Sequence, residues 1–386
     1  MNSVKKREPL PDILRGFAIL TVILGHSIQE GSGTAFHENS LYFYDKLYQF
    51  LYSFHMPLFM LISGYFAWPG MARASGPAQR RLLLKRRSLS LLLPVLAWTV
   101  FEQLWLLAES RGTAAAFSSV PGFVKAFGLG LVSTGWFLWA VFWCFLIVYI
   151  LHFFFRDSPV LYGLGFLTMF VTPDGLGLGA YKFMFPYFLA GFYFHRYQSL
   201  RDKTPPEPTG RKLSKTPGSR LLPSVPQNDW LKIAVLGAVF GILFLFFDES
   251  SMIYLTGYKL IGKNPLRQLS IDLYRMIIGF AGAGFFILLW KKVWELTGKR
   301  PFSVLQTLGQ NSLALYMISG EISLIAGMKL RPFLFQSHLL NLAEAAAVTG
   351  ISYLLCLLLK RIPLLRLLTG DIIPSLLKKD PGSTPS

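Results

Sequence analysis

A series of apolar runs, each about 20 residues long, constrains this chain more than any other feature of its sequence. A helix of that length rises about 1.5 Å per residue and so crosses a hydrocarbon core of roughly 30 Å. The composition agrees, because 53% hydrophobic and 15% charged residues do not fit a water-soluble chain of 386 residues. The sequence therefore predicts an all-α, polytopic membrane protein. Its ten predicted transmembrane helices are residues 12–30, 46–67, 88–108, 133–155, 159–173, 180–197, 230–247, 272–290, 304–328 and 340–359.

The basic residues predict how these helices are oriented. Lys and Arg number 38 against 20 Asp and Glu, a formal net charge of +18 that in a soluble protein would suggest a nucleic-acid partner. Here the basic residues lie between the apolar runs, and most of them face one side when the N-terminus is placed inside. The distribution of charge therefore predicts the orientation of the helices in the membrane. A nucleic-acid partner is not expected. Both termini are expected in the cytoplasm, and the lipid bilayer is the partner.

The polar segments and the cysteines complete the predicted organisation. The first run carries Arg15 and lacks a small-residue cleavage site after it, which indicates a retained helix rather than a signal peptide. Gln198–Asn228 holds six prolines among Lys, Arg, Ser and Gly, which predicts a disordered linker. Cys144 and Cys356 lie within apolar runs and are interpreted as packing residues. The predicted parts are residues 1–197 with six transmembrane helices and the Arg and His motif, 198–229 as a cytoplasmic linker, 230–360 with four transmembrane helices, and 361–386 as a cytoplasmic tail.

The most informative segment is Asp12–Glu30, DILRGFAILTVILGHSIQE, in which Arg15 and His26 interrupt a transmembrane helix. Titratable groups at membrane depth are costly and usually face the protein interior or a water-filled cavity. The two residues are eleven apart, which returns to nearly the same helix face about 16 Å further along the axis. Arg15 is expected near the cytoplasmic mouth and His26 deep in the outer half. Asp12 and Glu30 lie close enough in sequence to pair with them.

These residue types suggest acid–base chemistry at an anion site. A cation at the cytoplasmic mouth can hold a phosphate or a carboxylate, and a neutral imidazole can take a proton from an alcohol, which contributes about 10² to 10⁴ in rate. Glu30 would then set the tautomer of His26 and stabilise its imidazolium. In the structural alternative, Arg15 extends to the cytoplasmic headgroups and His26 hydrogen-bonds another helix. The residues alone leave both interpretations open.

Further polar and aromatic residues are candidates for substrate contact. In the second predicted helix, Pro57 should kink the chain and free a carbonyl near His55, and Ser63 precedes a glycine that permits close helix approach. His55 either hydrogen-bonds across the bundle or contacts substrate. Trp136 begins a stripe of three tryptophans that is more typical of packing or of an interfacial belt than of a sugar platform. The outer loop Asp248–Asp272 is long and polar enough to bind a glycan, and equally serves as a connector.

Five segments follow one another between residues 15 and 319: RGFAILTVILGH, FHMPLFMLISGYF, KRRSLSLLLP, WFLWAVF and LGQNSLALYMIS. In this order they resemble the acyltransferase type 3 family of integral-membrane acyltransferases, and FHMPLF is most similar to its fucose 4-O-acetylase-like branch. The resemblance covers nearly the whole chain. It implies transfer of an acyl group, usually acetyl from acetyl-CoA, across the bacterial cytoplasmic membrane to a hydroxyl of a surface or secreted glycan.

Matched residue by residue, the resemblance also implies roles. Arg15 and His26 match the family's Arg-and-His motif, in which the His is catalytic. Arg86 and Arg87 match basic residues before the third transmembrane helix that are associated with acyl-CoA. Family members often have Tyr-x-x-His in the ninth helix, whereas here Tyr316 is followed by Met, Ile and Ser. Any role of that His is therefore absent or replaced.

The predicted function is an O-acyltransferase that uses acyl-CoA, in particular acetyl-CoA, to acylate a glycan, with His26 as general base and without a metal. An acyl-His intermediate is the less favoured route. Two rival hypotheses are a transporter or flippase of a glycan or lipid-linked substrate, and a succinyltransferase of a periplasmic glucan. The acceptor, the acyl chain and a homo-oligomeric state are left open. The predicted site residues are His26 and Glu30 for catalysis, Arg15, Arg86 and Arg87 for the donor, and His55, Ser63 and Trp136 for the substrate.

Overall fold

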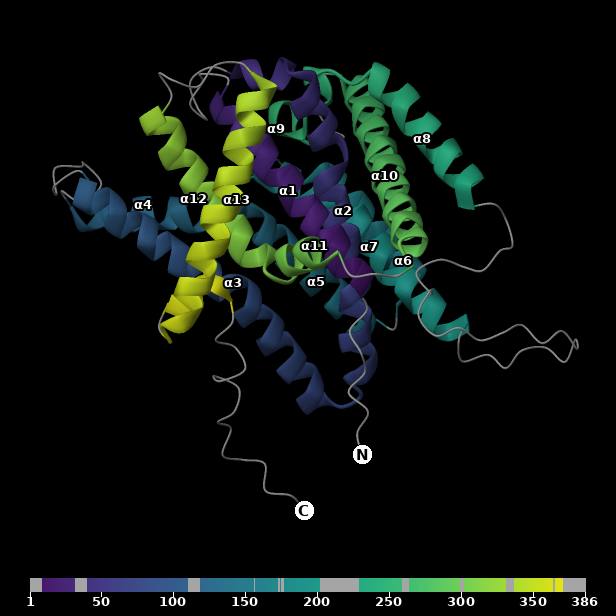
Figure 1. Cartoon of the computed structure of the whole chain (residues 1–386). Helices are drawn as coiled ribbons and strands as arrows, with labels where there is room; N and C mark the ends of the chain where they lie inside the picture. Colours follow the sequence, from purple (N-terminus) through teal and green to yellow (C-terminus); the bar gives the residue numbers. More distant parts are fainter. Residues whose placement is uncertain are drawn as a thin grey trace, which may run out of the picture.

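The computed structural model is a bundle of α-helices, and the residues it describes contain no β-strand (Figure 1). Short 3₁₀ turns connect some helices, as at η1 (Ser40–Tyr44), η4 (Glu249–Ser251) and η6 (Leu365–Thr369). The described residues are 9–31, 40–109, 119–155, 157–172, 174, 177–201, 229–258, 264–298, 302–330, 337–363 and 365–370. The helices are α1 (Pro9–Gly31), α2 (Lys46–Arg73), α3 (Pro77–Glu109), α4 (Val120–Ser133), α5 (Trp136–Phe154), α6 (Pro159–Val171), α7 (Leu178–Arg201), α8 (Asp229–Leu245), α9 (Ile253–Thr256), α10 (Pro265–Leu296), α11 (Ser303–Gln310), α12 (Ser312–Leu330) and α13 (His338–Arg361).

The apolar helices confirm a multi-pass membrane protein. Within the described residues, six helices are long and apolar enough to cross a bilayer, namely α1, α2, α3, α5, α10 and α13. Two shorter helices, α4 and α6, are also apolar. Every predicted transmembrane range falls on helix, but α7, α8 and α12 do not meet the same length and hydropathy requirements. The number of membrane crossings therefore stays a prediction.

The structure differs from the sequence-based prediction at four places. The ninth predicted helix is divided at Asn311 into α11 and α12, and residues 120–133, which lie almost entirely between two predicted transmembrane helices, form α4. α7 continues to Arg201, so residues 198–201 of the predicted linker are helical, while 202–228 lie outside the described residues. In the predicted tail, η6 packs on α3, where the Trp98 indole donates to the carbonyl of Leu368 at 3.0 Å; residues 371–386 lie outside the described part.

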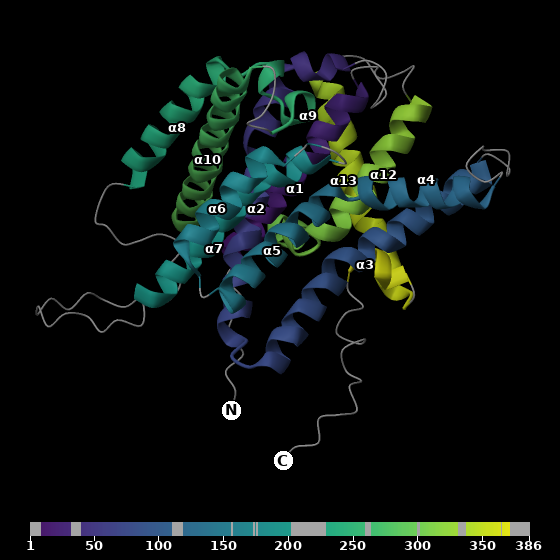
Figure 2. The ribbon, with the colours of Figure 1, turned by 180° about the vertical axis from the view of Figure 1, so that it is seen from behind.

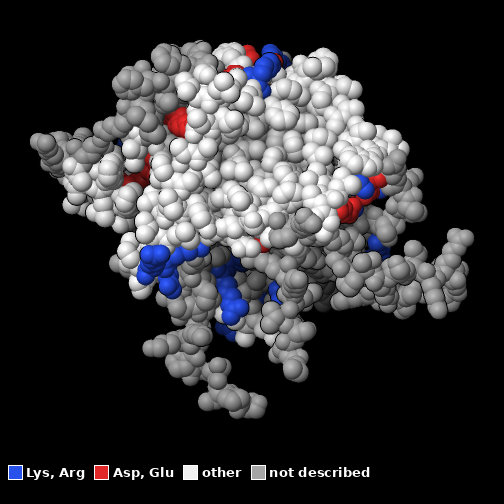
Figure 3. All heavy atoms as spheres, in the orientation of Figure 1, with Lys and Arg blue, Asp and Glu red and all other residues white. Residues whose placement is uncertain are grey.

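The two ends of the helical bundle differ in charge. One face of the bundle, at the bottom of Figures 1 and 2, contains the start of α1, the turn between α2 and α3, and the end of α13. Figure 3 shows Lys and Arg gathered on this lower face, beneath a broad surface with few charged side chains. We call it the basic face. The basic face corresponds to the side predicted as cytoplasmic, and its position in a cell stays a prediction.

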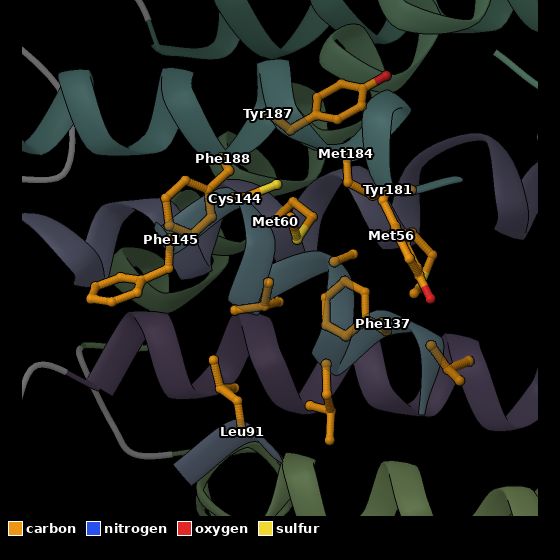
Figure 4. Close-up of a cluster of buried hydrophobic side chains, with 14 of the residues drawn as sticks. Met56, Met60, Leu91, Phe137, Cys144, Phe145, Tyr181, Met184, Tyr187 and Phe188 are labelled. Atoms are coloured by element: carbon orange, nitrogen blue, oxygen red, sulfur yellow. The ribbon is translucent and has the colours of Figure 1, made fainter. Parts of the chain in front are cut away.

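The main hydrophobic core lies where α2, α5 and α7 meet (Figure 4). Gly64 of α2 lies against the backbone of α7, because a Cβ there would be 1.9 Å from the carbonyl oxygen of Phe188. The predicted close helix approach at this glycine is therefore confirmed. Cys144 is buried among Phe145, Phe188 and Met60 in this core, and both cysteines are buried thiols, as expected for packing residues.

The position of α1 depends on a second close approach, to α11. A Cβ on Gly16 would lie 1.9 Å from the carbonyl oxygen of Leu305, and a Cβ on Gly309 would lie 1.8 Å from that of Asp12. Real Cβ atoms do not come closer than 3.0 Å to such atoms, so only glycine fits at either position. α1 also packs against α2, α10, α12 and α13. The helix that carries Arg15 and His26 is thus enclosed by the bundle.

Candidate active site

Arg15 lies on the half of α1 nearest the basic face and is held by two neighbours. Its guanidinium is 4.5 Å from the centroid of the Phe66 ring of α2. Its Nη1 is 3.8 Å from Oδ1 of Asp12, which confirms the predicted pairing of these two residues. Asp12 is buried and accepts a hydrogen bond from the Gln310 amide of α11 at 3.4 Å. The cation is therefore oriented by contacts from α1, α2 and α11 while a quarter of its side chain stays exposed.

Arg87 of α3 approaches the same phenylalanine. Its Nη2 donates to the Phe66 carbonyl oxygen at 3.3 Å, and its guanidinium is 5.7 Å from the ring centroid of Phe145. Arg86 is exposed. Arg15 and Arg87 thus both contact Phe66, one at its ring and the other at its carbonyl oxygen, whereas Arg86 lies on the surface. Two guanidinium groups near one residue form an arrangement suited to a phosphate.

His26 and His55 lie in the same region of the bundle, at the half of α1 farther from the basic face. The two side chains are close enough for a charge on one to affect the other. The ring of Tyr52 lies against Gly25, where a Cβ would be 2.7 Å from the Tyr52 Cε2 atom. The glycine before His26 thus lets an aromatic ring reach the backbone of α1. Two histidines and a tyrosine from α1 and α2 meet at this point.

The tautomer of His55 follows from its hydrogen bond. The Nδ1 atom lies 2.5 Å from the carbonyl oxygen of Leu51, and the side chain is buried. A carbonyl oxygen only accepts, so Nδ1 carries a proton, and in the neutral ring Nε2 is then the nitrogen with the lone pair. The ring of Tyr52 meets His55 edge to face, with the centroids 4.6 Å apart. These contacts fix the orientation of the His55 ring and make Nε2 its acceptor nitrogen when the ring is neutral.

A cluster of aromatic side chains extends from Tyr52 and was not predicted from the sequence. Tyr254 of α9 lies 5.8 Å from Tyr52 and 5.9 Å from Trp136, between ring centroids. The ring of Tyr316 of α12 lies 6.0 Å from that of Phe137, the residue after Trp136, between ring centroids. These residues come from α2, α5, α9 and α12, so no spacing in the sequence could have grouped them. They place several hydroxyl groups and ring faces near the histidines.

The remaining predicted site residues are divided by the structure. Trp136 lies in the aromatic cluster, whereas Trp143 of the same stripe is exposed on the outside of α5. Ser63 donates to the Phe59 carbonyl oxygen of its own helix at 2.8 Å and is two turns from His55. Glu30 is buried near Tyr42 and makes no hydrogen bond to His26 among the described residues.

The predicted acceptor loop Asp248–Asp272 is ordered in part, and residues 259–263 lie outside the described part. It forms η4 and α9 and is held to α10 by Arg275, which donates to the Thr256 hydroxyl at 2.9 Å and pairs with Asp272. This anchoring positions Tyr254 towards Tyr52. The loop therefore contributes a side chain to the aromatic cluster and is more than a connector.

The geometry combines an anion-binding end and a proton-accepting end along one helix. Arg15 and His26 are separated by about 16 Å along α1, with Arg87 joining the first and His55 the second. Among the described residues, no group of three or more His, Cys, Asp and Glu side chains could hold a metal ion. The chemistry that the described side chains support is recognition of an anionic substrate and proton transfer by an imidazole.

Comparison with known proteins identifies the family. Residues 10–361 match the acyltransferase type 3 family, described as "Acyltransferase domain". "Nodulation protein NolL" of Mesorhizobium japonicum is 23% identical over 317 residues, which cover 81% of this chain and 75% of that protein. "Nodulation protein NolL" of Sinorhizobium fredii is 31% identical over 189 residues, 47% of each chain. No solved structure matches the chain. Because the family match spans nearly all of the described helices, including those that carry Arg15, His26, His55 and Arg87, the chain belongs to the acyltransferase type 3 family and is a multi-pass membrane acyltransferase.

Proposed function

We propose that the protein transfers an acyl group, in particular acetyl, from acyl-CoA at the basic face to a hydroxyl of a surface or secreted glycan on the opposite side. The observation that carries this proposal is the enclosed helix α1, with a cation pair, Arg15 and Arg87, at one end and a histidine pair, His26 and His55, at the other. Coenzyme A carries phosphates at one end of a long arm and the thioester at the other. The two ends of coenzyme A therefore match the two ends of α1, with the phosphates at the arginines and the thioester at the histidines.

In the proposed reaction, His26 takes the proton of the acceptor hydroxyl while the hydroxyl oxygen attacks the thioester carbonyl carbon. The new carbon–oxygen bond forms the ester, the carbon–sulfur bond breaks, and the proton passes from His26 to the thiolate of CoA. The reaction needs no further reactant. His55 and the tyrosines Tyr52 and Tyr254 are placed to hydrogen-bond the sugar and to stack on its apolar faces. The likeness of FHMPLF to the fucose 4-O-acetylase-like branch stays a prediction about the branch, and the acceptor sugar is left open.

The proposal is tested with purified protein in sealed vesicles that contain a glycan. Acetyl-CoA and succinyl-CoA are added separately on the side of the basic face, and free thiol and the mass of the glycan are followed together. Thiol release that needs the glycan and adds acetyl to it supports the proposal, whereas added succinyl would identify the succinyltransferase alternative. Movement of an unmodified glycan across the membrane without thiol release would instead establish a transporter or flippase.

The two neighbouring arginines of α3 should differ in their effect on the donor. Arg87→Gln should raise the KM for acetyl-CoA about tenfold or more, because a charge-assisted hydrogen bond contributes about 1.5–3 kcal/mol. Arg86→Gln removes the same charge from an exposed position and should raise KM less. Initial rates across donor concentrations measure both variants, after size-exclusion chromatography confirms that each is folded. A larger effect at Arg86 would show that the donor approaches over the surface of α3.

A further inference from the structure

A pocket lies around the turn between α2 and α3. The turn itself is at the basic face (Figures 1 and 2). The volume of the pocket is about 650 Å³, and none of the proposed catalytic or donor-binding residues lines it. Polar and aromatic groups share its wall. The lining residues are Trp68, Met71, Ala72, Ala74, Ser75, Arg80, His152, Phe153 and Leu200.

The cation of this pocket is Arg80, near the start of α3. Its Nη2 donates to the Ser75 carbonyl oxygen at 3.2 Å, and its guanidinium is 4.7 Å from the ring centroid of Phe153. Among the residues that the structure describes, no carboxylate forms an ion pair with Arg80. The nearby carboxylate, Asp157, is already engaged by Arg196 at 2.5 Å and by the Nδ1 atom of His152 at 2.7 Å. Arg80 is thus oriented but not neutralised, which suits it to bind an anion.

The aromatic wall of the pocket is held in a defined orientation. The Trp68 indole donates to the Ser199 hydroxyl at 3.1 Å, and its ring meets His152 edge to face with the centroids 5.8 Å apart. Arg196 lies 5.4 Å from the Trp68 ring centroid. Fixed rings beside an oriented guanidinium can contact a planar base and a phosphate at once.

The pocket is connected to the donor-binding arginines by the geometry of α3. Arg80 and Arg87 are seven residues apart, which places them on the same face of the helix, two turns and about 10 Å from each other. Both stack on rings of α5, over Phe153 and Phe145. Arg87 and Arg15 then meet at Phe66. The cations therefore form a path from the pocket to the start of the Arg15–His26 wall.

We propose that this pocket binds the nucleotide end of acyl-CoA. Arg80 contacts the ribose phosphate of the nucleotide, and the rings of Trp68 and Phe153 lie beside the adenine. The inference rests on the proposed function, and it adds a subsite that neither the sequence motifs nor the site around α1 includes. The diphosphate then lies towards Arg87 and Arg15, and the pantetheine arm follows α1 to His26. In this arrangement the enzyme binds the nucleotide at one end of the donor and the thioester at the other.

Two donors separate this subsite from the site around α1. S-Acetylpantetheine carries the same thioester and arm as acetyl-CoA but no nucleotide. Arg80→Gln should raise the KM for acetyl-CoA by roughly tenfold and leave kcat/KM for S-acetylpantetheine unchanged. Arg81→Gln is the matched control, because it removes the same charge one residue along α3, from an exposed side chain that does not line the pocket. Equal KM values for acetyl-CoA in wild type and Arg80→Gln would overturn the subsite while the acyltransferase function stands. Absence of thiol release from any donor in wild type would instead reject the proposed function.

A phosphate site at this face could also hold a lipid headgroup, so the binding test includes lipid. Binding of adenosine 3′,5′-bisphosphate is measured in nanodiscs of phosphatidylcholine, with and without phosphatidylglycerol. The proposal predicts binding in both, and its loss in Arg80→Gln and Trp68→Leu. Binding that disappears when phosphatidylglycerol is present, or that persists in both variants, would overturn the nucleotide assignment in favour of lipid phosphate or of another location.

Discussion

Replacing His26 with glutamine should lower the rate of acyl transfer by about 10² to 10⁴, the range that a general base contributes. Glutamine keeps a hydrogen-bonding side chain of similar size but cannot take the proton of the acceptor hydroxyl. The arginines near Phe66 are remote from this substitution, so the KM for acetyl-CoA should change little. Turnover at saturating donor, followed as free thiol with glycan present, measures the effect.

The control for this experiment is His338→Gln. His338 lies at the start of α13 with half of its side chain exposed, and it pairs with Asp45 of the α2 N-cap at 3.5 Å. The substitution removes an imidazole that lies outside the candidate active site, so the rate of acyl transfer should stay close to that of wild type. If His26→Gln retained wild-type turnover, His26 would be a packing residue. His55, whose Nε2 is also an acceptor, would then become the candidate base.

Gly16→Ala should prevent α1 and α11 from docking, although it adds a single methyl group. The new Cβ would lie 1.9 Å from the Leu305 carbonyl oxygen, and a backbone atom cannot rotate away as a side chain can. Overpacking of this kind costs about 1–3 kcal/mol or more. Gly16 follows Arg15 directly and is one helical turn from Asp12. A shift of α1 would therefore also displace these two side chains. We expect loss of the monodisperse peak in size-exclusion chromatography, or a folded protein of much lower thermal stability and no transfer.

Gly320→Ala provides the same substitution where there is room. Gly320 lies within α12, and a Cβ there meets nothing within 4 Å. In a helix interior, alanine is favoured over glycine by about 1 kcal/mol. This variant should therefore be as stable as wild type or more so. Equal stability of the two variants would mean that α11 does not pack on α1 as the structure shows.

The sequence predicted the helical fold because the length of an apolar run and the width of a bilayer are directly related. It also predicted the pairing of Arg15 with Asp12, since one turn of helix determines that contact. The break at Asn311 was not predicted, because the polar residues Gln310, Asn311 and Ser312 were counted as part of one apolar run and no proline marks the break. α4 was missed because its glycines at 128 and 130 are typical of a loop.

The site was predicted only where its residues share a helix. Arg86 and Arg87 are equivalent in a motif, and only the orientation of α3 against α2 and α5 shows that Arg87 faces inward. Tyr52 and Tyr254 are distant in the chain and lie together because α9 is anchored on α10. Contacts between helices depend on how the helices pack, and the spacing of residues along one helix does not predict that packing.

Because α1 is one continuous helix, the separation between Arg15 and His26 cannot change with the substrate. A small activated donor such as acetyl phosphate has its phosphate and its acyl group on adjacent atoms. It can engage the arginine or approach the histidine, but it cannot span the roughly 16 Å between them. The enzyme should therefore discriminate among acyl donors by molecular length before it discriminates by acyl group, which would exclude short, abundant acyl phosphates and favour thioesters on an extended arm.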